Sequence, residues 1–294
     1  MSDGQLIGLE DLFAGSYGSI ARAVSADGKV IVGYSFGPPS APIRAFRWTE
    51  AEGMIDLGDL TGGGARSWGL AVNADGTVVV GRTYNADGKE VAYRWTEADG
   101  MVDLSDPDDV FANCAYGVSA DGKVIVGYGT NKDGKQEAFR WTEREGKAVG
   151  LGDLDGGDFH SFANAVSADG KVVVGYSASS KGEEAFRWTE ATGKMEGLGI
   201  LSGHERSEAL AVNADGSVIV GISGSGHRDN YPAYRAFIWT QATGIKALSE
   251  FLGEKVSIWE AGSCVMRPAS VPMARSSLAL VWTRTAKRIA TSQN

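Results

Sequence analysis

The chain has 294 residues, enough for one large domain or two, and carries a formal net charge of −9 at neutral pH. Nucleic acids and anionic membrane surfaces are bound through basic patches, so this acidic balance speaks against both as partners. The sequence contains no run of 18 or more apolar residues, and we therefore expect no membrane span.

One unit is repeated along nearly the whole chain. An Asp-Gly pair recurs at intervals of 48, 46, 48 and 46 residues, at Asp27, Asp75, Asp121, Asp169 and Asp215. A tryptophan recurs with a similar period, at Trp48, Trp95, Trp141, Trp188 and Trp239. Such a period is typical of solenoids, propellers and other arrays of one supersecondary unit. Because the period is unbroken, it favours a single domain over residues 1–294.

Each unit contains four short extended runs, because β-branched and aromatic residues alternate with small or polar ones between turn signals. In the first unit these runs are ARAVSA, KVIVGYS, AFRWT and MIDLGDL. Asp-Gly accepts the positive φ angles of a tight hairpin turn, and TEAEG ends another hairpin loop with a glycine. Three antiparallel returns predict a four-stranded meander. The crossover helices that a parallel sheet would need are not recognisable in the sequence.

Face-to-face packing of these units around an axis predicts an all-β fold, a β-propeller of four-stranded antiparallel blades. The first run supports this fold, because small residues at alternate positions, such as Ala21 and Ala23, suit crowded inner strands. We expect larger residues on the opposite face of this run to fill the space between blades. These residues are Leu70, Val72, Tyr116, Val118, Leu210 and Val212.

The two ends of the chain predict a sixth blade. The leading residues QLIGLEDL match the fourth run, and five complete units follow from about residue 17 to residue 252. In a closed ring this orphan strand would join three strands from the C-terminus and remove the open seam. The degenerate tail, residues 260–294, shows no recognisable unit.

A shift of the reading frame recovers the missing unit. With suitable third bases, ASVPMARSSLALVWTRTAK is read one base earlier as GVRADGAVVVGAGVDPHGK, which contains Asp-Gly and VVVG in order. We therefore hypothesise a frameshift near Trp259 to Gly262. Sequencing of the gene tests it, since codons that cannot spell ADGAVVVG in the shifted frame would exclude the hypothesis.

Three stretches of the repeat carry a family resemblance: GDLTGGGARSWGLAVNADGTVVVG, GDLDGGDFHSFANAVSADGKVVVG and EAFRWTEATG. They resemble the bacterial family called "probable extracellular repeat, HAF family", over about residues 6–252. The resemblance implies an exported or cell-surface, propeller-like protein and implies little about activity. MSDGQLIGLEDL lacks the basic start and apolar core of a signal peptide, so export would need another route or a leader that has been removed.

The loops between the fourth and first runs vary most between units. Asp153, Asp155 and Asp158 cluster carboxylates in one of these loops, and carboxylate oxygens are calcium ligands. Their spacing lacks a full calcium-loop pattern, and Asp153 is a repeat position shared with Asp59. A solvated turn is the alternative interpretation.

Two histidines lie in equivalent loops of successive units. His160 and His204, with Asp158 or Glu205, are candidates for a zinc pair or for binding across blades. No third clear ligand accompanies them. A third histidine, His227, and Tyr231 lie in the long loop SGSGHRDNYPAYR, which is a candidate contact surface or a plain insertion.

An arginine precedes the tryptophan in four units, at Arg47, Arg94, Arg140 and Arg187. These side chains are candidates for a ring of anion sites. Because a repeated residue usually serves the repeat, pairing with the repeated acidic residues is the alternative. Those acidic residues are Glu50, Glu97, Glu143 and Glu190.

The sequence contains no Ser-His-Asp order, nucleophile elbow, phosphate loop or paired-Cys zinc motif. We predict a monomeric, non-catalytic interaction module that presents rim loops to a protein or glycan and has no cofactor, with calcium at the aspartate cluster as the alternative. The alternative is a hydrolase or lyase that acts on polysaccharide, with rim carboxylates and His160 or His204 at the central channel. An enzyme should show titratable groups of several blades converging at the axis, whereas a binding module should not.

Overall fold

The computed structural model describes residues 8–9, 11–13, 18–38, 42–60, 66–105, 110–225 and 234–256. Within these residues, twenty strands form five four-stranded antiparallel sheets, and in every sheet the strands are neighbours in chain order. Each sheet is one copy of the repeat, so the predicted four-stranded meander is confirmed.

The first sheet contains β1 (Ser19–Val24), β2 (Val30–Ser35), β3 (Arg44–Thr49) and β4 (Gly53–Asp56). The second contains β5 (Ser67–Val72), β6 (Val79–Tyr84), β7 (Glu90–Thr96) and β8 (Gly100–Asp103). The third contains β9 (Val110–Val118), β10 (Val124–Asn131), β11 (Gln136–Thr142) and β12 (Ala148–Gly150). The fourth contains β13 (Ser161–Val166), β14 (Val172–Ser179), β15 (Gly182–Thr189) and β16 (Lys194–Gly199). The fifth contains β17 (Arg206–Val212), β18 (Val218–Gly224), β19 (Tyr234–Thr240) and β20 (Gly244–Ala247).

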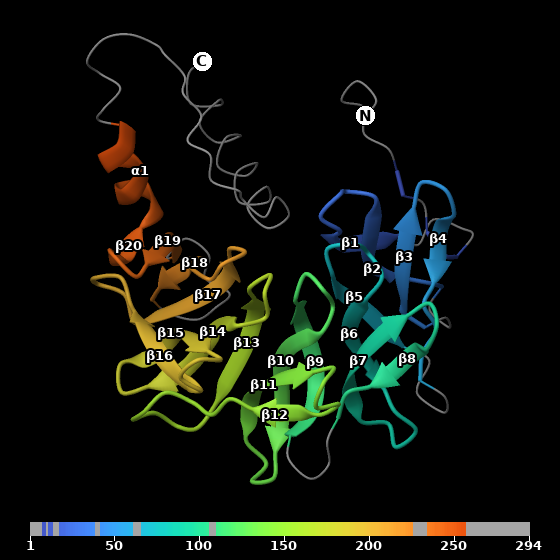
Figure 1. Ribbon diagram of the computed structural model, residues 1–294, viewed down its shortest axis with the longest axis horizontal. Helices are drawn as coiled ribbons and strands as arrows, with labels where there is room; N and C mark the ends of the chain where they lie inside the picture. Colours follow the sequence, from blue (N-terminus) through green and yellow to red (C-terminus); the bar gives the residue numbers. More distant parts are fainter. Residues whose placement is uncertain are drawn as a thin grey trace.

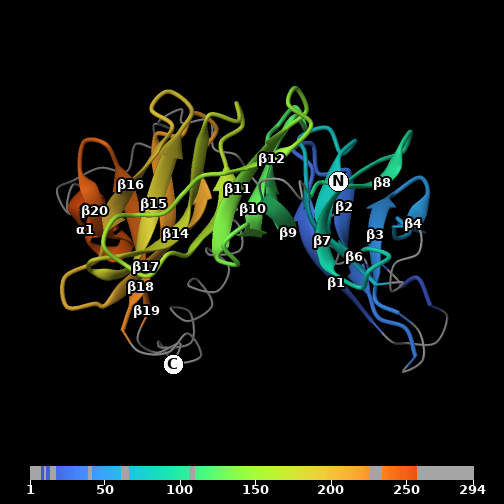
Figure 2. The same ribbon diagram turned by 90° about the horizontal axis from the view of Figure 1, so that it is seen from below.

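The sheets follow one another around an axis (Figures 1 and 2), and each packs against the next. The first strands of the sheets, β1, β5, β9, β13 and β17, lie innermost, and the fourth strands lie outside (Figure 1). The first and fifth sheets form the two ends of the arc. The predicted all-β propeller is therefore confirmed for the five repeats.

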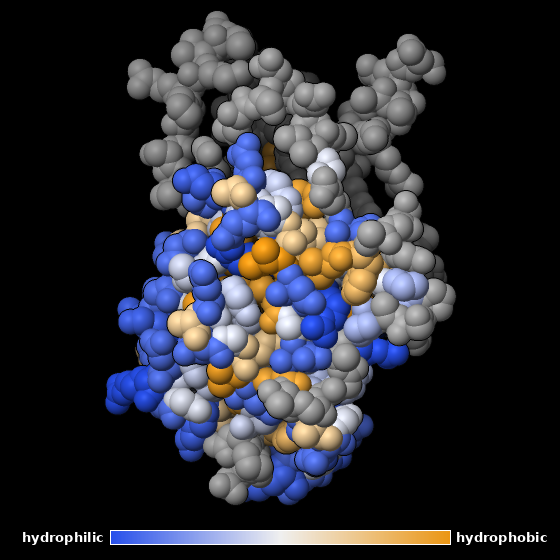
Figure 3. Space-filling view, turned by 90° about the vertical axis from the view of Figure 1, so that its right-hand side faces the viewer, coloured by the Kyte–Doolittle hydropathy of each residue, from blue (hydrophilic) through white to orange (hydrophobic). Residues whose placement is uncertain are grey.

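One helix, α1 (Leu248–Val256), follows the last strand and packs against β19 and β20. Among the described residues, no helix is long and apolar enough to cross a membrane. On the side of the molecule where β4 and β8 lie, hydrophobic residues are interspersed with hydrophilic ones (Figure 3).

The leading segment occupies the place expected for the end of a preceding blade. The backbone N–H of Leu12 donates to Ser35 Oγ at 3.2 Å, as that of Leu154 donates to Ser177 Oγ at 3.0 Å. Leu154 follows the outer strand of the third sheet and reaches the fourth, so Leu12 holds the same position relative to the first sheet. The rest of the predicted sixth blade, residues 1–7 and 257–294, lies outside the described residues.

The Asp-Gly turns link neighbouring sheets. Gly76 has a φ of +79°, and a Cβ there would overlap the side chain of Val30 in the preceding sheet. Glycine is therefore required both for the turn and for the close approach. The alanines before Asp-Gly form a series of backbone hydrogen bonds around the axis, in which each N–H donates to the next carbonyl. The distances are 2.9 Å for Ala26 to Ala74, 3.1 Å for Ala74 to Ala120, 3.0 Å for Ala120 to Ala168 and 3.1 Å for Ala168 to Ala214.

Each inner strand carries a β-bulge at the equivalent residue, and β9 carries a second one at Asn113. In the fourth sheet, Ala163 pairs with Gly175 and Ala165 pairs with Val174, so Asn164 has no partner on β14. A Cβ on Gly175 would overlap the carbonyl oxygen of Phe162. The glycine of the VVVG run is thus what lets the inner strand approach closely enough to bulge.

Because of the bulge, one prediction about the inner strands, that their larger residues fill the space between blades, is wrong for three residues. The residues at its centre, Leu70, Tyr116 and Leu210, were expected between the blades, but they line the axial channel. Tyr116 is 38% exposed and Leu210 is 45% exposed. The unpaired residue is re-aimed because the extra residue breaks the strict alternation of faces. The following valines do pack against the inter-sheet core, as Val72, Val118 and Val212 show.

Candidate functional site at the channel mouth

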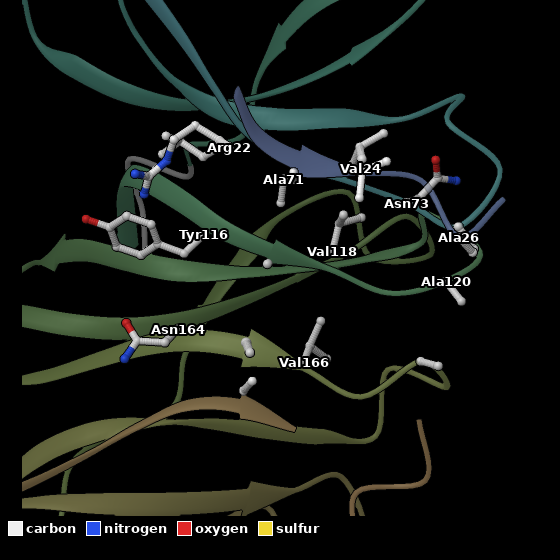
Figure 4. Close-up of a pocket in the computed structure, with 18 of the residues that line it drawn as sticks. Arg22, Val24, Ala26, Ala71, Asn73, Tyr116, Val118, Ala120, Asn164 and Val166 are labelled. Atoms are coloured by element: carbon white, nitrogen blue, oxygen red, sulfur yellow. The ribbon is translucent and has the colours of Figure 1, made fainter. Parts of the chain in front are cut away.

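A cavity of about 830 Å³ runs along the axis between the inner strands of all five sheets (Figure 4). The ring of alanines from the Asp-Gly turns borders one end of it. Arg22, Tyr116 and Asn164 project into the opposite end, as Figure 4 shows. The bulges thus place one non-repeated side chain per sheet at the same end of the channel.

We call this end the channel mouth and define it by the residues around a further cavity of about 490 Å³. They are Arg22, Leu70, Tyr116, Tyr128, Phe162, Asn164, Tyr176, Glu208 and Leu210. All five sheets contribute to it, through the inner strand or, in the third and fourth sheets, also through the second strand. The loops that connect successive sheets lie at the same end, because they lead into the starts of the inner strands.

Four aromatic rings form a column at the mouth. The ring centroids of Tyr116 and Tyr128 lie 5.9 Å apart, and those of Tyr128 and Phe162 lie 4.9 Å apart. Phe162 stacks on Tyr176 at 4.9 Å, with an angle of 12° between the ring planes. Aromatic pairs at such distances add about 0.5–1.5 kcal/mol beyond their buried area. The third and fourth sheets therefore present a rigid aromatic wall to the mouth.

A charged network supports this wall from the second sheet. The Arg82 guanidinium lies 4.4 Å from the centroid of the Trp68 ring, and its Nη1 lies 2.7 Å from Glu90 Oε2. The Tyr128 hydroxyl donates to Glu90 Oε1 at 3.3 Å. Burial, and then the nearby Glu90 carboxylate, raises the pKa of Tyr128 to about 12. Burial likewise raises the pKa of Tyr116, so both phenols are neutral hydrogen-bonding groups at physiological pH.

The mouth contains few charges. Among the described residues that line it, Arg22 is the one cation and Glu208 the one carboxylate. Asn164 Nδ2 donates to Glu208 Oε1 at 3.1 Å and to the carbonyl of Ala209 at 2.9 Å. Within the described part of the chain, the Arg22 guanidinium forms no hydrogen bond or ion pair.

The predicted acidic cluster lies in the loop between β12 and β13. Asp155 and Asp158 are exposed, and Asp153 is half-buried. Burial, followed by the charges of Glu137 and Asp155, raises the pKa of Asp153. In the described ranges, no group of three or more His, Cys, Asp or Glu side chains is arranged to hold a metal ion. The calcium site therefore stays a prediction from sequence alone.

The two histidines have separate partners. His160 Nε2 lies 3.6 Å from Glu183 Oε1, and Glu183 also pairs with Arg206. His204 Nδ1 lies 3.1 Å from the hydroxyl of Ser223.

Glu205 is exposed in the loop before β17. His160 also contacts Phe162, with 6.3 Å between the ring centroids, and so lies at the edge of the aromatic column. His227 and Tyr231 lie outside the described residues.

The repeated arginines join neighbouring sheets. Arg140 Nη2 lies 3.0 Å from Glu190 of the next sheet, and its guanidinium lies 5.6 Å from the Trp188 ring centroid. Arg94 Nη2 similarly lies 3.5 Å from Glu143 of the next sheet. These contacts support the interpretation that the arginines serve the repeat, which was the alternative to an anion site.

Sequence reasoning missed the mouth itself. The position between the two small residues of the inner strand holds four different residue types in the five units, as Arg22, Leu70, Tyr116, Asn164 and Leu210. The flanking positions stay small. This variation within an otherwise strict repeat could have indicated the channel mouth. A position that the fold does not constrain can carry a residue used for binding.

No protein-family model matches the chain, and no curated protein does. Solved structures do. TolB from Acinetobacter baumannii is similar with a TM-score of 0.50 and 14% identity, over 75% of this chain and 53% of that chain. A protein assigned as TolB, from Agrobacterium tumefaciens, has a TM-score of 0.53 and 15% identity, over 78% of this chain and 79% of that one. A prolyl endopeptidase reaches 0.53 with 12% identity, over 79% of this chain and 36% of that one. These likenesses show the fold alone.

Proposed function

We propose that the protein is a non-catalytic binding module that holds a protein or glycan partner at the channel mouth. The observation that carries this proposal is the composition of the mouth. Aromatic and aliphatic side chains from successive sheets border it, with one arginine and one carboxylate among the described lining residues. Exposed aromatic and aliphatic groups around a concave site are typical of binding surfaces.

The same composition argues against the polysaccharide hydrolase. Glycoside hydrolysis canonically needs two carboxyl groups facing one bond, and the described mouth residues supply one, Glu208. Glu208 is held by Asn164 Nδ2. His160 and His204, the histidines considered for catalysis, have separate partners. Membership of the HAF repeat family, with an exported or cell-surface location, is part of the proposal and rests on the repeat motifs.

Two matched variants test the proposal. Leu210, at the mouth, is 45% exposed, and Val102, on the outer strand β8, is 46% exposed. We expect Leu210→Asp to weaken partner binding by at least about tenfold, since it places a charge in an apolar contact. Val102→Asp, with the same new charge far from the mouth, should bind as the wild type does.

The measurement is binding of the purified protein to a glycan array and to candidate proteins, combined with turnover assays on polysaccharides. Binding that Leu210→Asp abolishes and Val102→Asp preserves supports the mouth as the site. Turnover of any polysaccharide by the wild type would overturn the non-catalytic assignment. Binding that both variants retain would move the site away from the mouth.

A further inference from the structure

Arg22 is a charged residue that the fold does not need. The equivalent bulge positions of the other four sheets hold Leu70, Tyr116, Asn164 and Leu210, so a propeller blade forms equally well with apolar or neutral residues there. Arg22 is exposed at the mouth and has no protein partner among the described residues. Its guanidinium is therefore free to pair with a group that the protein itself does not supply.

The channel beyond Arg22 is apolar. One valine from each inner strand lines it below the mouth, namely Val24, Val72, Val118, Val166 and Val212. Alanines fill most of the remaining lining, and no charged side chain other than Arg22 belongs to it among the described residues. Figure 4 shows Val24, Val118 and Val166 between the mouth and the ring of alanines. An aliphatic group entering from the mouth would exchange water for hydrocarbon contacts.

We propose that the channel mouth binds an organic carboxylate, with the acid group at Arg22 and an aliphatic body along the inner strands. This proposal names the ligand chemistry of the site in the proposed function and rests on that function. Two sources share this chemistry: the C-terminus of a polypeptide that ends in an aliphatic residue, and an alkanoate.

Arginine favours a carboxylate because its planar guanidinium presents parallel N–H donors that match the two oxygens. Tyr116 contributes a protonated hydroxyl at the same end of the channel (Figure 4). Asn164 uses both amide hydrogens internally and offers only its Oδ1 as an acceptor.

The charge of the protein limits the ligand to one acid group. The net charge of −9 and the single carboxylate of Glu208 at the mouth both disfavour a polyanion. A monoanion meets less repulsion than a polyanion, because each further negative charge on the ligand adds its own repulsion. The favoured ligand therefore carries one carboxylate and an otherwise uncharged body.

Calorimetric titration of the full chain tests this with two acids and their neutral counterparts. The acids are octanoate and the peptide N-acetyl-Ala-Val-Leu, and the neutral counterparts are octan-1-ol and the same peptide as its amide. We expect at least one acid to bind, and its neutral counterpart to bind at least about tenfold more weakly, because a charge-assisted pair is lost.

Arg22→Gln removes the cation while keeping a polar side chain, and we expect it to weaken acid binding by at least about tenfold. Lys29→Gln is the matched control, since it removes one positive charge from the exposed turn after β1, at the other end of the channel. It should leave acid binding unchanged. Circular dichroism of both variants shows whether they remain folded.

Binding of octanoate alone identifies an alkanoate site, binding of the peptide acid alone identifies a C-terminus site, and binding of both leaves the shared chemistry confirmed. Equal binding of acids and neutral counterparts would overturn the proposal, as would an Arg22→Gln variant that binds like the wild type, or no binding at all. If neither acid binds, but a glycan or protein binds in a way that Leu210→Asp abolishes, then the carboxylate proposal is rejected and the proposed function is retained.

Discussion

Repeated and non-repeated positions of the same inner strands have different surroundings. Ala163 and Ala209 repeat, are fully buried and pack in the inter-sheet cores. The residues one step further along, Asn164 and Leu210, do not repeat and face the channel. The residues that recur in every unit pack between the sheets and build the ring. The residues that differ between units are concentrated at the channel mouth, where the ring opens to solvent. Stability and binding should therefore depend on separate sets of residues.

The largest expected effect tests the buried side of this comparison. Phe139 is fully buried within the core between the second and third sheets. Phe139→Ala should lower the free energy of unfolding by about 3–5 kcal/mol, because it removes buried area and leaves a cavity. Leu210→Ala, at the mouth, should change it by less than about 0.5 kcal/mol. Urea denaturation measures both, and similar losses in the two variants would contradict the division.

A smaller loss of stability is expected at the bulge, where the repeated buried residues adjoin the non-repeated residues that face the channel. Gly175 lies opposite the bulge, and a Cβ would overlap the backbone of Phe162 and Ala163. Gly175→Ala should destabilise the protein by about 1–3 kcal/mol, because the inner strand must move away. It should also displace Asn164 and so alter ligand binding at the mouth.

Gly134→Asn is the control for this glycine. Gly134 has a φ of +74° in an open hairpin, a Cβ at this position would have no atom within 4 Å, and asparagine tolerates that conformation. We expect a loss below about 0.5 kcal/mol in urea denaturation. If Gly175→Ala were equally mild, the bulge would not depend on the missing side chain.

The repeated part of the fold could be predicted from the sequence because its causes are local. Asp-Gly turns and period-2 alternation recur in each unit, so the four strands, their antiparallel order and the propeller followed from one unit and its copies. The hydrogen bond of Leu12 to Ser35 agrees with the match of the leading residues to the fourth run, and the sixth blade stays a prediction.

The channel mouth could not be predicted in the same way. Period-2 alternation assigns Tyr116 and Leu210 to the inter-sheet face, and one bulged residue reverses that assignment. The aromatic column joins Tyr128 to Phe162, which are brought together only by the packing of separate sheets. The aspartates and histidines were chosen for their chemistry, and the arrangement of their loops was not visible in the spacing.

The smallest expected effect concerns the acidic residue of the repeated turns. The hydroxyl of Ser119 donates to Asp121 Oδ1 at 2.7 Å, and the N–H of Lys123 donates to the same oxygen at 3.1 Å. The Ser119 hydrogen bond is the main cause of a lowered pKa for Asp121; partial burial opposes it. A carboxyl whose pKa is lower in the folded state stabilises that state above its unfolded pKa, near 3.8.

This stabilisation is lost as the pH falls below about 4, through the folded pKa of Asp121. In urea denaturation, the wild-type midpoint should therefore drop in that range, and Asp121→Asn should show a lower midpoint at pH 7 with a smaller acid-induced drop. Ser119→Ala should act in the same direction, because it removes the main donor. A variant and wild type with parallel pH profiles would show that the turn carboxylate contributes nothing, leaving glycine and the inter-sheet alanine hydrogen bonds as what holds these turns together.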